Sequence, residues 1–202
     1  SVDGLSILAD GCYVDVTFGG GGHSKEILKQ LSENGRLFAF NQDPDAEENA
    51  IADDRFTLIG QNFSFLKNFL RMYQAIPVDG VLADLGVSFH QFDVAERGFS
   101  FRFSGPLDMR MDQKRELTAA KVVNEYAIED LQRIFREYGE LRNASDIASR
   151  IDLARIQKPI RSIEALREVL EDLVPEKHQH KFLAQVFQAL RIEVNEELKV
   201  IQ

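Results

Sequence analysis

The chain has 202 residues, 44% of them hydrophobic, and a formal net charge of −9, which suits one domain with at most a small insert and disfavours non-specific nucleic-acid binding by the whole surface. It contains no run of 18 apolar residues and no charged segment followed by an apolar one, so we expect neither a transmembrane helix nor a signal peptide. The single cysteine, Cys12, cannot form an internal disulfide and suits a reducing compartment, so we expect a cytoplasmic protein with no membrane partner.

Residues 13–24 read Tyr-Val-Asp-Val-Thr-Phe-Gly-Gly-Gly-Gly-His-Ser. The β-branched and aromatic residues at 13–18 predict a strand. Four glycines follow it, and then a helical pattern that carries Ile27, Leu28 and Leu31. This order is typical of the first half of a nucleotide-binding βαβ unit, in which a ligand can lie directly against a backbone that has no side chains.

The spacing of the glycines narrows the class of ligand. The dinucleotide pattern G-x-G-x-x-G would need a glycine at Ser24, which disfavours a nicotinamide-dependent oxidoreductase, and the Lys of a phosphate-binding P-loop is missing. The acid and glycines at Asp15, Gly19 and Gly21 fit S-adenosylmethionine (SAM) methyltransferases, with Thr17 in place of their usual first glycine. A flexible turn without a ligand remains the alternative.

Three further strands and two helices follow in alternation. Strands are predicted at 36–40, 55–60 and 78–84, and helices at 45–52 and 65–73. Strands that alternate with helices form a parallel, Rossmann-like α/β sheet, and its ligands gather at the carboxyl ends of the strands. The residues at those ends are Asn41, Phe63 and Asp84.

The end of the second strand is where nucleotide enzymes usually place an acid that accepts the ribose hydroxyls. Here the position holds Asn41, and we expect weaker cofactor affinity, by ~1–2 kcal/mol, because an amide lacks the charge of a carboxylate. Asp43 could partly substitute or could simply cap the turn. Phe63 could lie against an adenine or could pack in the core.

Five motifs together resemble one family. They are Thr17-Phe-Gly-Gly-Gly-Gly-His-Ser24, Asp84-Leu-Gly-Val-Ser88 with Gln91, Glu96-Arg-Gly-Phe-Ser-Phe-Arg102, Gly105-Pro-Leu-Asp-Met-Arg-Met-Asp112 and Phe187-Gln-Ala-Leu-Arg-Ile-Glu-Val-Asn195. In sequential order over essentially the whole chain, they resemble the RsmH (MraW) family of bacterial ribosomal RNA methyltransferases. The resemblance implies methyl transfer from SAM to the exocyclic N4 of a cytidine in small-subunit (16S) rRNA.

The resemblance also implies which residues contact SAM: Gly21, Gly22, His23, Asn41, Phe63, Asp84 and Gln91. The chain departs from the family pattern at Asn41, where Asp is usual, and at Phe89, where a second Ser is usual. Family members also continue beyond position 202 through further strands, so we expect the sheet to be incomplete on its C-terminal side. These departures leave open a SAM- or RNA-binding homologue, or a fragment, without catalytic activity.

Cytosine N4 is a poor nucleophile because its lone pair is delocalised into the ring. An acceptor that hydrogen-bonds the amino group would localise this pair and receive the proton. Asp84 is our first candidate for this catalytic role and Ser88 the second, although a carboxylate at a strand end could equally serve only to bind the cofactor.

The following stretch interleaves arginines and phenylalanines. Arg97, Arg102 and Arg110 are the candidates for RNA binding, because arginines contact phosphates in RNA complexes. The phenylalanines at 99, 101 and 103 have period two, and we expect at least two of them to be buried.

Residues 117–180 show helical patterns without strands, at 118–126, 128–138, 144–156 and 162–173, and a long amphipathic helix follows at 183–200. We therefore predict a SAM-binding part at 1–114, a helical and RNA-recognising insert at 115–181, and a helix at 182–202 that returns to the methyltransferase domain. His178 and His180 lack the further ligands of a metal site, so no metal is expected. Both a monomer and a homodimer remain open.

Overall fold

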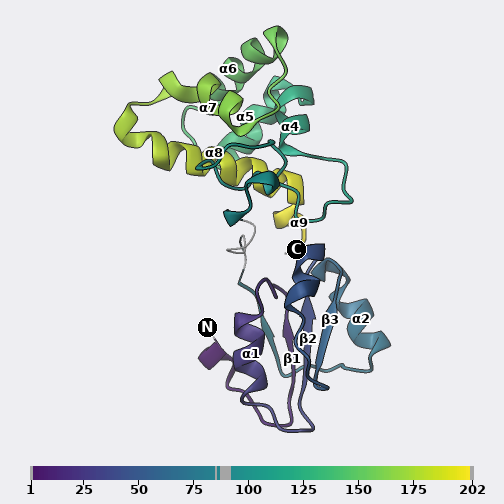
Figure 1. Ribbon diagram of the computed structural model, residues 1–202. Helices are drawn as coiled ribbons and strands as arrows, with labels where there is room; N and C mark the ends of the chain where they lie inside the picture. Colours follow the sequence, from purple (N-terminus) through teal and green to yellow (C-terminus); the bar gives the residue numbers. More distant parts are fainter. Residues whose placement is uncertain (1, 85, 87–91, 201–202) are drawn as a thin grey trace. The chain divides into compact units, whose positions relative to one another are not determined.

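The structure is a computed structural model that describes residues 2–84, 86 and 92–200 (Figure 1). Internal contacts divide the chain into two compact units, residues 1–90 and 91–202. The boundary predicted at 114/115 falls inside the second unit, and the predicted three-part division into domains stays a prediction. Each unit is described by itself below.

The first unit is built on a four-stranded parallel sheet, as the alternation of strands and helices predicted. Its strands are β1 (Cys12–Asp15), β2 (Arg36–Phe40), β3 (Phe56–Ile59) and β4 (Gly80–Leu82), in the order β3-β2-β1-β4. Tyr13 lies opposite Leu37 on one side and Gly80 on the other. The fold class is therefore α/β, with β1 and β2 in the middle of the described sheet.

The two faces of this sheet bury different sets of side chains, because successive residues of a strand point to opposite sides. Tyr13, Leu37 and Leu82 pack with Ile27 and Leu28 of helix α1 (Gly22–Leu28). The other face carries Val14, Val16, Phe38, Phe40 and Ile59, which pack with Leu70 of helix α2 (Leu66–Met72). The two apolar layers hold the strands, and hence their carboxyl ends, in fixed register.

Elements of the first unit differ from the sequence prediction in type or in length. The predicted helix at 45–52 is wrong in type, because the segment forms a short 3-10 helix, η2 (Pro44–Asn49). Ala46 is buried there while Glu47, Glu48 and Asn49 are exposed, so the segment lacks the apolar stripe that stabilises an α-helix. Strands β1 and β4 are also shorter than the predicted 13–18 and 78–84.

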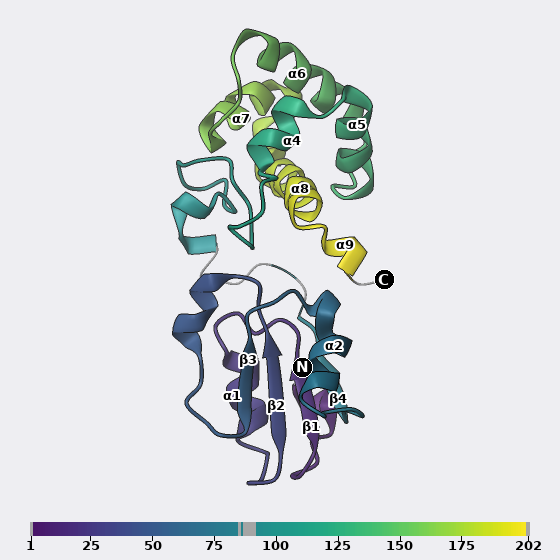
Figure 2. The same cartoon turned by 90° about the vertical axis from the view of Figure 1, so that its right-hand side faces the viewer.

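The second unit is helical, and its helices largely match the predicted ones. They are α4 (Ala119–Glu125), α5 (Ile128–Glu137), α6 (Ala144–Gln157), α7 (Ile163–Leu170), the 3-10 turn η5 (Glu171–Leu173), α8 (Glu176–Asn195) and α9 (Glu197–Val200). Thr118 and Ser162 cap α4 and α7, since their hydroxyls accept the N–H groups of Lys121 and Ala165. Figure 2 shows α4 to α7 above the long α8.

The predicted helix at 183–200 begins earlier than expected and is interrupted, because Glu196 adopts the left-handed conformation between α8 and α9. Ahead of it, buried Asn195 joins the helix to the segment before α4. Its amide donates to the Met109 carbonyl at 2.8 Å and its oxygen accepts the Met111 N–H at 2.8 Å. None of the described helices combines the length and the hydropathy that a membrane-spanning helix requires.

Candidate functional site

The carboxyl ends of the four parallel strands lie at one edge of the first unit's sheet (Figure 1). The glycine turn at 19–22 follows β1, and Asn41 follows β2 directly. The short 3-10 helix η3 (Phe63–Phe65) follows β3, and Asp84 lies two residues beyond β4. The structure thus brings the predicted cofactor residues of this unit to one edge.

The glycine turn has a conformation that favours glycine. Gly19 and Gly21 have φ angles of 49° and 75°, in the left-handed region. A Cβ on Gly21 would lie 3.0 Å from the Phe18 ring, whereas one on Gly20 or Gly22 would meet no atom within 4 Å. The turn is therefore tightly fixed on its inner side and leaves open space against its backbone at Gly20 and Gly22.

A buried carboxylate lies beneath this turn. Asp15, at the end of β1, is fully buried and accepts the Ser24 hydroxyl at 2.8 Å and the Thr17 N–H at 3.0 Å. Burial raises the pKa of the Asp15 carboxyl above its ordinary value, and the bonds from Ser24 and Thr17 offset part of this shift. The sequence pattern pointed to Asp15 only as the acid ahead of the glycines, and did not predict that Ser24 and Thr17 would bind it.

Asp84 is held through its backbone to the turn that follows β1. Its N–H donates to the Thr17 hydroxyl at 2.8 Å, while its side chain is 70% exposed. One carboxylate oxygen lies 4.0 Å from Nδ1 of His23, the second residue of α1. An exposed carboxylate held by its backbone can act as a hydrogen-bond acceptor for a ligand at this edge.

The other two strand ends are also ordered by side-chain hydrogen bonds. The Asn41 oxygen accepts the Asp43 N–H at 2.9 Å, so it already serves the turn after β2. Asn62 caps η3 and donates to the Gln42 side chain at 2.8 Å, which joins the loops after β2 and β3. Phe63 is partly buried against the apolar layer that contains Phe40.

Two predicted site residues, Ser88 and Gln91, lie outside the described residues, as does Phe89. The three predicted RNA-binding arginines belong to the second unit and differ in their surroundings. Arg97 is buried and donates to the carbonyls of Arg110 and Met111.

Arg110 forms an ion pair with Asp108 at 2.7 Å and donates to two carbonyls, those of Gln113 and Arg115. Arg97 and Arg110 thus hold their own segment together, whereas Arg102 is exposed. Of the three phenylalanines, Phe99 is buried, Phe101 is half-buried against Phe187 and His180, and Phe103 is exposed.

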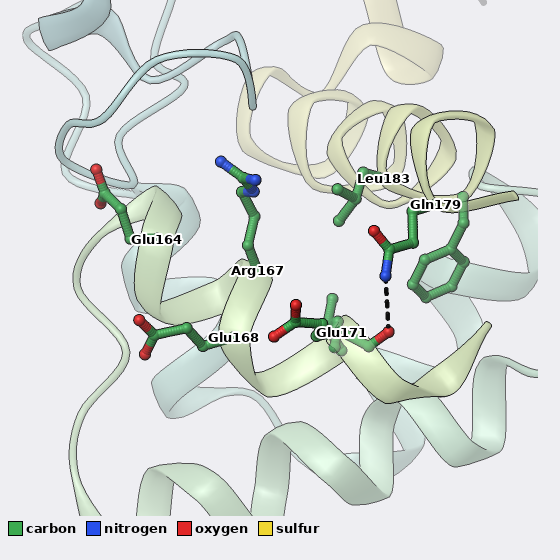
Figure 3. A pocket seen from close by; sticks show the side chains of 8 residues that line it. Glu164, Arg167, Glu168, Glu171, Gln179 and Leu183 are labelled. Atoms are coloured by element: carbon green, nitrogen blue, oxygen red, sulfur yellow. Dashed lines mark hydrogen bonds between the residues drawn. The ribbon is translucent and has the colours of Figure 1, made fainter. Parts of the chain in front are cut away.

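A hollow of about 270 Å³ lies in the second unit between α7, η5 and α8 (Figure 3). Its described lining includes the carboxylates of Glu164, Glu168 and Glu171, the guanidinium of Arg167, and the apolar side chains of Leu170, Phe182 and Leu183. The excess of carboxylates disfavours a phosphate-bearing ligand there. Among the described residues, no group of three or more His, Cys, Asp or Glu side chains could hold a metal ion.

Comparison with known proteins gives one consistent result. Residues 1–202 match the model of the MraW methylase family. Proteins named ribosomal RNA small subunit methyltransferase H are 60% identical in Flavobacterium johnsoniae, 58% in Flavobacterium psychrophilum and 54% in Bacteroides thetaiotaomicron, each over 202 residues. The matches cover 100% of this chain and 67%, 69% and 66% of those relatives, so the chain spans about two thirds of their length.

Replacing Asp15 with Asn tests the buried carboxylate. Between the ordinary pKa of an Asp, about 3.9, and the raised pKa of Asp15, the folded state binds more protons than the unfolded state. The wild-type free energy of unfolding therefore falls as the pH rises through this window. Because the amide introduced by Asp15→Asn cannot ionise, we expect the stability of the variant relative to the wild type to increase with pH from about pH 4 until the pH has passed the raised pKa of Asp15.

Urea unfolding of both proteins, followed by circular dichroism at each pH, measures this difference. A pH-independent offset between the two proteins reports the altered hydrogen bonds and does not affect the test. A difference that stays constant or decreases over the range would contradict the assignment.

Proposed function

The chain belongs to the MraW methylase family, and from this premise we propose that it transfers a methyl group from SAM to N4 of a cytidine in small-subunit (16S) ribosomal RNA, in the cytoplasm. One observation carries the proposal. The residues that the family resemblance assigns to SAM, from Gly21, Gly22 and His23 to Asn41, Phe63 and Asp84, share one edge of a parallel sheet. Such an edge is where α/β sheets bind nucleotide-like ligands.

The residues at this edge fit the chemical parts of the cofactor. The open backbone at Gly20 and Gly22 lets a ligand approach closely. The exposed Asp84 carboxylate suits either the ammonium group at the amino-acid end of the cofactor or the amino group of the substrate cytosine. We assign Asn41 to the ribose and Phe63 to the adenine. When bound, the cofactor supplies an electrophilic methyl group on its sulfonium sulfur.

In the reaction, the role of the protein is to localise an electron pair and accept a proton. We assign Asp84 as the acceptor: a carboxylate oxygen receives a hydrogen bond from the cytosine amino group, which increases the electron density on N4, and then takes the proton that N4 loses. The backbone bond to Thr17 fixes the position from which this carboxylate acts. Ser88 is the second candidate for contact with the amino group.

For RNA contact, we propose Arg102 over Arg97 and Arg110. A guanidinium already bonded to carbonyls or a carboxylate must lose those bonds before it can bind a phosphate, and Arg97 and Arg110 are engaged in this way. Arg102 and the adjacent Phe103 are both exposed, an arginine beside an aromatic ring of the kind that single-stranded RNA recognition uses.

The function is tested by titration calorimetry with SAM, followed by tritium transfer from labelled SAM to small ribosomal subunits that lack the modification. We expect both binding and transfer. Gly22→Ala places a methyl group in the open space of the site and should weaken SAM binding by about tenfold, whereas Gly4→Ala, which also meets no neighbouring atom, should not. Binding without transfer would indicate a non-catalytic homologue, and no binding would refute the proposal.

Asn41→Asp is expected to tighten SAM binding. An aspartate can keep one oxygen on the Asp43 N–H and present the other, with its charge, to the ribose hydroxyls. We expect the Kd to fall by about tenfold, equivalent to ~1–2 kcal/mol. Asn34→Asp, an exposed change in the turn before β2, adds the same charge as a control. An equal change in the Kd for SAM in both variants, or no change in Asn41→Asp, would show that Asn41 does not contact the ribose.

Arg102→Ala is expected to weaken binding of the RNA substrate and to leave SAM binding unchanged. Because one phosphate contact is lost, the KM for small subunits should rise by about three- to tenfold, and the slope of log affinity against log salt should become shallower by about one. Binding of SAM, measured by calorimetry, should stay unchanged. Arg71→Ala, an exposed change on α2, is the control, and an unchanged KM in Arg102→Ala would exclude this residue from the RNA contact.

A further inference from the structure

The segments that follow β1 and β4 are connected by a side chain where the ladder of backbone hydrogen bonds between the two strands ends. The Val16 N–H donates to the Leu82 carbonyl at 2.9 Å, as in a regular parallel ladder. Beyond this pair, the Asp84 N–H donates to the hydroxyl of Thr17 at 2.8 Å. The backbone of Asp84 is therefore held by a side chain from the short segment between β1 and the glycine turn.

The acceptor in this bond is itself oriented. The Thr17 hydroxyl lies 3.4 Å from Oδ1 of Asp15, and the Thr17 N–H donates to the same oxygen at 3.0 Å. When the hydroxyl proton points toward the carboxylate, the oxygen lone pairs face away from it and are free to accept the Asp84 N–H. Hydrogen bonds in such a chain polarise and strengthen one another.

The same carboxylate also fixes the other side of the turn. Its second oxygen, Oδ2, accepts the Ser24 hydroxyl at 2.8 Å, and Ser24 lies in α1 directly after Gly22 and His23. One buried carboxylate thus connects the helix after the glycines, through Ser24, with the end of β4, through Thr17. These are the two segments that carry His23 and Asp84.

We propose that Thr17 is a positioning residue for methyl transfer: its hydroxyl, oriented by Asp15, sets where the Asp84 carboxylate stands relative to the glycine turn. The proposal rests on the proposed function, since it assumes that Asp84 meets the cofactor or the reacting amino group. Thr17 itself makes no contact with the reacting atoms in this scheme. This positioning role accounts for the threonine at position 17, where SAM methyltransferases usually have their first glycine.

Three variants of the whole chain test the proposal. Thr17→Val keeps the shape of the side chain and removes the hydroxyl, Thr17→Ser restores a hydroxyl, and Thr57→Val makes the same change in β3 as a control. Thermal melting by circular dichroism establishes that each variant is folded, and Thr17→Ala replaces the valine variant if the latter melts at a markedly lower temperature. The readouts are amide hydrogen exchange at Asp84 and the kcat and KM for methyl transfer.

We expect Thr17→Val to speed exchange of the Asp84 amide by about tenfold, since its hydrogen-bond acceptor is lost. We also expect kcat to fall by about ten- to a hundredfold, with little change in the KM for RNA, because a displaced carboxylate acts on the reacting centre. Thr17→Ser should restore both values to within about threefold of the wild type, and Thr57→Val should change neither.

The proposal is overturned if Thr17→Val retains wild-type kcat, if Asp84 exchange is unaffected, or if serine fails to rescue kcat. An inactive wild-type protein would instead refute the proposed function, and the positioning role would fall with it. An active wild type beside an equally active valine variant would refute the positioning role alone, so the two failures can be told apart.

Discussion

The first unit depends on a carboxylate that is buried where the chain leaves the sheet. Burying an ionisable group is costly unless hydrogen bonds satisfy it, and Asp15 receives them from Ser24 and Thr17. Because those donors belong to segments on both sides of the glycine turn, satisfying the carboxylate also fixes the turn. The conformation of four consecutive glycines, which would otherwise be highly variable, is in this way determined by a few polar contacts beneath them.

The parallel sheet supplies the second constraint. One apolar layer lies between the sheet and α1 and another between the sheet and α2, and together they hold the strands in register. The carboxyl ends of the strands therefore lie at one edge, whichever residues occupy those positions. The chemistry of the site is then set by single residues at those ends. Asn41 and Asp84 are both polar strand-end residues, but the oxygen of Asn41 already serves its own turn, whereas the side chain of Asp84 is exposed.

Much of this arrangement could be predicted from the sequence, because it follows from local patterns. The strand predicted at 36–40 is β2 at its observed residues, and the helical patterns at 118–126 and 128–138 correspond to α4 and α5. The bond from Asp84 to Thr17 could not be predicted, since it joins residues 67 positions apart and depends on the register of β1 with β4. The hydrogen bonds of Arg97 and Arg110 to carbonyls of their own segment could not be predicted either. The sequence does not distinguish an arginine that binds RNA from one that binds the protein backbone.

All of the proposed roles depend on the strand ends of the first unit forming one methyl-donor site that faces Asp84. A crystal structure of the chain with SAM bound tests it most directly. We expect the cofactor to contact the backbone of the glycine turn and Asn41, and its sulfonium methyl group to point toward the side of the site where Asp84 lies. Cofactor bound elsewhere, for example in the hollow between α7 and α8, or a methyl group directed away from Asp84, would contradict the account.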